Sequence, residues 1–71
     1  MNVSYKKLWK LLIDKNMKKT DLLDVANISS VSLAKLGKNE NVTTDVLTKI
    51  CTALNCDISE IMEMVEDSNE Q

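Results

Sequence analysis

The chain has 71 residues and a formal net charge of −2, with a single glycine and neither proline nor histidine. We expect one small domain, near the lower size limit for a core without disulfides or metals. Histidine chemistry and a glycine-rich phosphate loop are excluded, so we expect no enzyme. The longest uninterrupted apolar run, Leu11 to Ile13, is too short for a membrane span or a signal-peptide core, which predicts a cytoplasmic protein.

The charges divide unevenly along the chain. Residues 1–49 contain all nine lysines and five acids, a balance of +4, whereas residues 50–71 contain six acids and no base, a balance of −6. Such a split favours a protein with one face for a polyanion and another kept away from it. The alternative is an ordinary solvated surface that ends in an acidic tail.

The first predicted helix begins at Ser4 as N-cap and runs to about Lys15, where Asn16 ends it. One apolar stripe follows helical spacing and should face the core; it consists of Tyr5, Leu8, Trp9 and Leu12. Leu11 and Ile13 widen this stripe, so part of the helix is expected to meet a second surface or a second subunit.

Residues 19–37 contain two short helical patterns separated by one tight break. The first runs from Thr20, a suitable N-cap, to about Ala26, and the second runs from about Ser30 to Leu36 and stops at Gly37. In the break, Asn27 suits a left-handed turn and Ile28 should fill the space between the helices; Ser29 or Ser30 caps the second helix. Two helices joined by such a turn have the shape of a helix-turn-helix.

Two further helices are predicted. Thr43 caps a helix that runs to about Leu54, and Asn55 is a plausible break. Asp57 and Glu60 have the spacing of a capping box, which predicts a fifth helix. That helix should bury Ile58, Ile61, Met62 and Val65. Residues 66–71 form an acidic tail without periodicity, for which we expect disorder.

Cys51 and Cys56 are the two cysteines and lie five positions apart. Without histidine or a closely spaced cysteine pair, a zinc site has little support, and we expect no metal or other cofactor. Cys51 falls on the apolar face of its helix and suits a small core position, whereas Cys56 falls in a turn. A redox role for either thiol remains open.

This order of elements resembles the Cro/repressor-type (Xre-like) helix-turn-helix family of phage and bacterial transcription regulators, particularly its small stand-alone repressors from Gram-positive bacteria. The similarity covers about residues 4–65 and is carried by Lys19-Thr20-Asp21-Leu22, Ala26-Asn27-Ile28-Ser29, Leu33 to Lys38, and the closing stretch from Ile50 to Ile61. It implies an all-α, five-helix, lambda-repressor-like DNA-binding domain over residues 1–65. The chain departs from the family in having Asn27 where glycine is frequent in the turn, no glutamine at the start of the first of these helices, and no arginine.

The resemblance also implies which residues meet DNA. Base edges would be read from the start of the helix after the turn, by Ser30, Val31 and Lys35 with Ser29 and Ser32 beside them. Serine can hydrogen-bond to any base edge, valine can contact a thymine methyl, and lysine can reach guanine. Phosphates would be bound by Thr20 with the neighbouring helix-start amides, and by Lys18, Lys19 and Lys38. The structural alternative is that Ser29 and Ser30 only cap the helix, that Val31 is a partly buried staple, and that many lysines are solvated.

Two functions follow as hypotheses. The first is a sequence-specific regulator of transcription, a repressor that binds double-stranded DNA at a near-palindromic operator as a homodimer. Its dimer surface would be the Met64-Val65 end of the fifth helix or the additional apolar residues Leu11 and Ile13. The second is a protein-interaction module on the same fold, such as an antitoxin or antirepressor, which the acidic last third and the lack of arginine favour.

Overall fold

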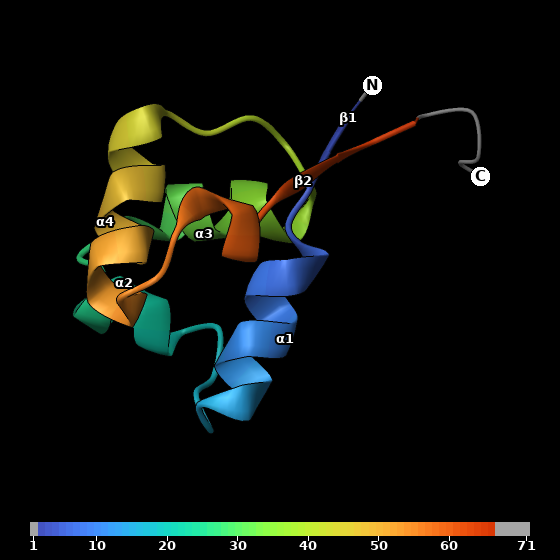
Figure 1. Ribbon diagram of the computed structural model, residues 1–71. Coiled ribbons are helices and arrows are strands. Elements are labelled where there is room, and N and C mark those ends of the chain that lie inside the picture. The colour runs from blue at the N-terminus through green and yellow to red at the C-terminus, as the bar shows by residue number, and fades with distance from the viewer. Residues whose placement is uncertain (1, 67–71) are drawn as a thin grey trace.

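The computed structural model describes residues 2–66, which form four α-helices, one short 3-10 helix and a two-stranded sheet (Figure 1). In chain order the elements are β1 (Asn2–Ser4), α1 (Lys6–Asp14), α2 (Asp21–Val25), α3 (Ser30–Gly37), α4 (Thr44–Leu54), η1 (Ile58–Glu60) and β2 (Glu63–Val65). The two strands lie side by side, so the two ends of the described chain meet at one edge of the helical body (Figure 1). No helix within residues 2–66 is long and apolar enough to cross a membrane.

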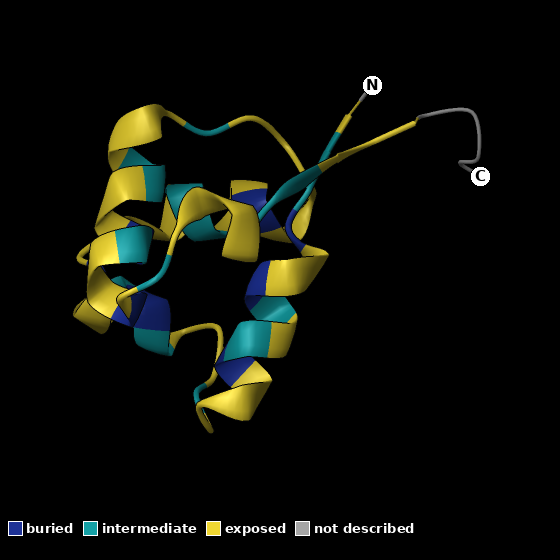
Figure 2. Cartoon of the chain, viewed as in Figure 1, coloured by how far each residue is buried: buried dark blue, intermediate teal, exposed yellow. Residues whose placement is uncertain are grey.

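One cluster of buried apolar side chains forms the core, and every α-helix or its C-terminal cap contributes to it (Figure 2). Its members are Tyr5, Leu8, Leu12, Leu22, Ala26, Ile28, Leu36, Ile50, Leu54 and Ile61. Full burial of one leucine or isoleucine contributes about 1.5–3 kcal/mol relative to exposure, so a 71-residue chain depends on each of them. The predicted stripe of α1 is confirmed, whereas Ile13 lies off it and is 71% exposed.

Each α-helix is followed within two residues by an asparagine in the left-handed region. Their φ angles are close to one another: 58° at Asn16, 54° at Asn27, 56° at Asn39 and 54° at Asn55. After α1, α3 and α4 the backbone N–H that follows this asparagine donates to a carbonyl five positions earlier, in the pairs Met17–Leu12, Glu40–Lys35 and Cys56–Cys51. These bonds satisfy carbonyls that a helix end leaves free and turn the chain sharply.

α3 ends at Gly37, where the sequence predicted the helix to stop. The glycine is the last residue of the helix, and the left-handed position belongs to Asn39. Asn39 also has a long-range role, because its side-chain Oδ1 accepts a hydrogen bond of 3.1 Å from the Tyr5 N–H. The buried Tyr5 hydroxyl donates to the Glu40 carbonyl at 2.9 Å, and burial raises the pKa of this phenol. The loop after α3 is thereby fastened to the start of α1.

The helix starts agree with the predicted caps at two positions and differ at two others. The Ser29 hydroxyl accepts from the Ser32 N–H, and the Thr43 hydroxyl accepts from the Val46 N–H. Ser4 is not a cap, since it lies in β1 and α1 begins after Tyr5. Thr20 occupies the N-cap position of α2, but its side chain makes no capping hydrogen bond.

The predicted fifth helix is wrong. The capping box of Asp57 and Glu60 forms, but it starts only the three-residue η1, after which the chain becomes extended as β2. β2 pairs antiparallel with β1 in the register Asn2–Val65, Val3–Met64 and Ser4–Glu63. A helix of one or two turns is marginal by itself, and backbone pairing with the other end of the chain offers these residues an alternative.

Burial around η1 follows from this change. Ile61 is fully buried and Met62 half-buried, as predicted, whereas Ile58 is 40% exposed and Val65 lies at the surface. The predicted tail at residues 66–71 falls outside the described residues except for the exposed Glu66.

We predict opposite stability effects at Gly37 and Asn39. Gly37→Ala should raise the free energy of unfolding by about 0.5–1 kcal/mol, because an added Cβ meets nothing within 4 Å and alanine favours the helix. Asn39→Ala should lower it by about 1 kcal/mol or more, through the left-handed backbone and the lost acceptor for Tyr5. Urea unfolding followed by circular dichroism measures both; an unchanged midpoint for Asn39→Ala would contradict the assigned role.

Ser29 should behave as a structural cap. Ser29→Ala removes the acceptor for the Ser32 N–H and should cost about 1 kcal/mol of stability. Ser30→Ala is the matched control, one position along on an exposed site, and should change stability by less than about 0.5 kcal/mol. Equal effects of the two substitutions in the same unfolding assay would show that Ser29 does not cap α3.

Candidate nucleic-acid interface

The helix pair α2–α3 is held by a short turn with alternating burial. Ala26 and Ile28 are buried, and Asn27 between them is exposed and left-handed. Leu22 on α2 and Leu36 on α3 are fully buried, and the two helices are in contact. One side of α3 packs into the core, which fixes the orientation of the helix. The opposite side of α3 lies at the surface.

The outer side of α3 carries three of the five predicted base-reading residues. Ser30, Val31 and Lys35 are all exposed, and Val31 has 63% of its surface accessible. The alternative interpretation of Val31 as a partly buried staple is not supported, since Val31 is among the exposed large apolar side chains. A hydroxyl, a branched apolar group and an ammonium group stand together on one helix, so this surface can both hydrogen-bond to and contact base edges.

Ser29 and Ser32 are placed differently from these three. The Ser29 Oγ accepts from the Ser32 N–H at 3.1 Å, and its own hydroxyl lies 3.2 Å from the Ser32 hydroxyl. Ser32 is also half-buried. These two side chains bond mainly to each other and fix the start of α3.

Ala34 also belongs to the exposed side of α3. It is exposed and lies three residues after Val31 and four after Ser30, which puts it on the same helix side. A methyl group there is able to contact a thymine methyl. Helical spacing from Ser30 was the signal that could have identified it.

The start of α2 does not provide the free amides expected for phosphate binding. The N–H groups of Asp21, Leu22 and Leu23 donate to the carbonyls of residues 18–20 at 3.0–3.1 Å. The Lys18 N–H donates to the Asp21 carboxylate at 2.9 Å, and Asp24 adds a second acid to the first turn. An anion at this terminus would meet bonded amides and two negative charges, so Thr20 offers only its exposed hydroxyl.

The predicted phosphate-binding lysines are exposed at two places along the helix pair. Lys18 and Lys19 precede α2, and Lys38 follows α3. The Lys19 ammonium lies 4.5 Å from the centre of the Trp9 ring, a cation–π distance that restricts its side chain. Two other lysines are engaged elsewhere, because Lys7 donates to the Ser59 carbonyl and Lys49 forms an ion pair with Asp45 on α4.

Comparisons with known proteins agree with this geometry. The family model of the Cro/C1-type HTH DNA-binding domain matches residues 7–67. The crystal structure of the transcriptional regulator VanUg (form II) is similar, with 55% sequence identity and a TM-score of 0.87 over 90% of this chain and 85% of that chain. No curated protein sequence matches. The chain belongs to the Cro/C1-type helix-turn-helix family of DNA-binding regulators, which are generally not enzymes.

Proposed function

We propose that this protein is a repressor that binds a near-palindromic operator as a homodimer and reads it with α3. The observation that carries the proposal is the exposed side of α3, where Ser30, Val31 and Lys35 project from a helix whose other side is fixed in the core. A recognition helix of this kind enters the major groove with its N-terminal residues nearest the bases. Repression follows where the operator overlaps a promoter and the bound protein occludes it.

Sequence preference and general affinity are assigned to different residues. Lys35 is one turn along α3 from Val31 and has the reach and charge to bond to guanine O6 and N7. Ser30 and Val31 are shorter and need closer approach to the bases, which their position in the first turn of α3 provides. Lys18, Lys19, Thr20 and Lys38 flank the helix pair and bind phosphates, which holds α3 in register without reading sequence.

The homodimer is proposed from apolar side chains that the core does not use. Ile13 on α1 and Met64 and Val65 on β2 are exposed. Burying these side chains against a second copy would remove apolar surface from water, which favours association. A dimer also matches the usual operator geometry, in which two half-sites lie about 34 Å apart on one face of the duplex.

We predict that Lys35→Ala and Lys38→Ala weaken DNA binding in different ways. Lys35→Ala should cost about 1–3 kcal/mol on the preferred site and relax the preference at one base position. Lys38→Ala should weaken all sequences alike and lower the slope of log affinity against log salt by about 0.9 per chain. Fluorescence anisotropy on preferred and scrambled duplexes over a salt series measures both effects.

Lys49→Ala is the matched control, because Lys49 is paired with Asp45 on α4 and should leave affinity and slope unchanged. Identical behaviour of the Lys35 and Lys38 variants would remove the assigned division between base and phosphate contacts.

The direct test is selection of random duplex DNA by the purified full chain at low and at physiological salt. Enrichment of a two-fold-symmetric motif at physiological salt would establish sequence-specific binding by a dimer. A motif without symmetry would support DNA reading and contradict the homodimer. No enrichment at either salt concentration would contradict the proposal and favour the protein-interaction module.

A further inference from the structure

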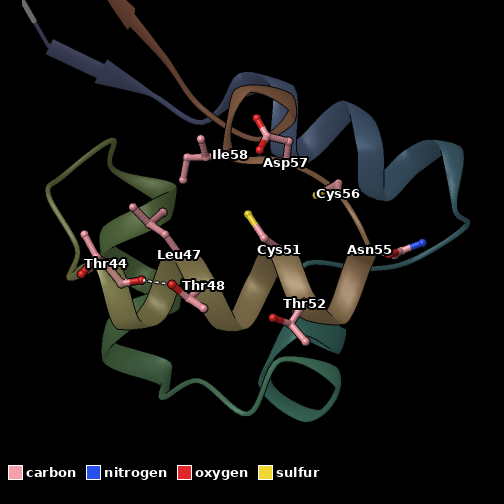
Figure 3. Close-up of a pocket in the computed structure, with 9 residues that line it drawn as sticks. All are labelled: Thr44, Leu47, Thr48, Cys51, Thr52, Asn55, Cys56, Asp57 and Ile58. Carbon is pink, nitrogen blue, oxygen red and sulfur yellow. Dashed lines mark hydrogen bonds between the residues drawn. The ribbon is translucent and has the colours of Figure 1, made fainter.

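A pocket of about 470 Å³ lies between α4 and η1, and both cysteines line it (Figure 3). Leu47 and Ile58 supply apolar walls, and Asp57 supplies a carboxylate. The Cys51 side chain points from α4 into this space, and Cys56 lies on the segment that leaves α4 (Figure 3). Both thiols are free and half-buried, so the pocket gives them limited contact with solvent.

The backbone holds these two thiols together. The Cys56 N–H donates to the Cys51 carbonyl at 3.0 Å, and both side chains line the same pocket. On one side of Cys56 the left-handed Asn55 fixes the turn, and on the other the Asp57 N–H donates to the Glu60 carboxylate at 2.9 Å. The pair is therefore arranged before any ligand arrives, which reduces the entropy cost of binding both sulfurs at once.

The surroundings restrict which chemistry the pair supports. Burial is the main cause that raises the pKa of each thiol, and the charges of Asp57 and Glu60 add to this for Cys51. Neutral thiols are weak nucleophiles, which disfavours rapid sensing of peroxide. Within residues 2–66 no three or more His, Cys, Asp or Glu side chains form a metal-holding group, which disfavours a tetrahedral zinc site.

We propose that Cys51 and Cys56 form a dithiol site for a soft, thiophilic centre that needs only two thiolates, a monosubstituted trivalent arsenical or a mercuric ion. Soft thiolates select such centres over harder metal ions. The arsenical exchanges two As–O bonds for two As–S bonds, and the thiol protons leave with its oxygens as water. The mercuric ion forms two Hg–S bonds and releases two protons. Neither step changes an oxidation state, and both products carry no net charge at sulfur, which suits a half-buried pocket beside two acids.

The test uses the full chain, kept reduced, with phenylarsine oxide and mercuric chloride as separate probes. Intact-mass measurement should show one arsenical per folded chain, retained in excess glutathione and removed by 2,3-dimercaptopropanol. Cys51→Ser and Cys56→Ser should each abolish retention, whereas Thr52→Ala, a change in the same pocket wall that leaves both thiols, should not. Circular dichroism confirms that each variant is folded. In a separate experiment with mercuric chloride, the thiolate-to-metal absorbance measures how many mercuric ions each chain binds. Comparing this result with that for the arsenical shows which of the two centres the site binds.

A second measurement asks whether the fold builds the site. Competition with the small dithiol should show the folded chain binding the arsenical about tenfold or more tightly than the chain in concentrated urea, which is about 1.4 kcal/mol. Retention by either single-cysteine variant, no retention by the folded wild-type chain, or equal affinity in urea would each overturn the proposal.

Discussion

The structure depends on four asparagines that adopt the left-handed backbone conformation just after each α-helix. For a residue with a Cβ this conformation costs about 1 kcal/mol or more, and among such residues asparagine tolerates it best. Asn16, Asn27, Asn39 and Asn55 each reverse the chain within a few residues, so short loops bring successive apolar faces to one core. A chain with one glycine and no proline has few other means of making such turns.

The same turns position the helix pair whose exposed side we propose to read DNA. The left-handed Asn27 turns the backbone between α2 and α3, and Ile28, which follows it, is buried in the core. Asn39 then follows the end of α3 and accepts from the Tyr5 N–H, so the loop beyond α3 is attached to the start of α1. The outer side of α3 is thus held from both ends by residues that lie outside the proposed base-reading set.

Local signals in the sequence predicted the local structure, but they did not predict the pairing of segments that are far apart in the chain. Caps such as Ser29 and Thr43 and the capping box at Asp57 depend on residues three apart, and they form as expected. β2 was predicted as a helix because its partner, β1, is some sixty residues away, and nothing in either segment specifies the other. The amides at the start of α2 were misjudged for a related reason: the preceding turn, which periodicity does not describe, already uses them.

The candidate interface shows the same division between local and tertiary information. The family resemblance implied Ser30, Val31 and Lys35, and the structure adds Ala34, which is exposed on the same helix side. With no arginine in the chain, the exposed side of α3 has one long cation and otherwise short side chains. Short side chains reach base edges only when the helix lies deep in the groove. A deep approach needs phosphate contacts on both flanks. Lys18 and Lys19, which precede α2, and Lys38, which follows α3, are the residues that we propose for those contacts. The described acids after residue 50, Asp57, Glu60, Glu63 and Glu66, lie outside α2 and α3.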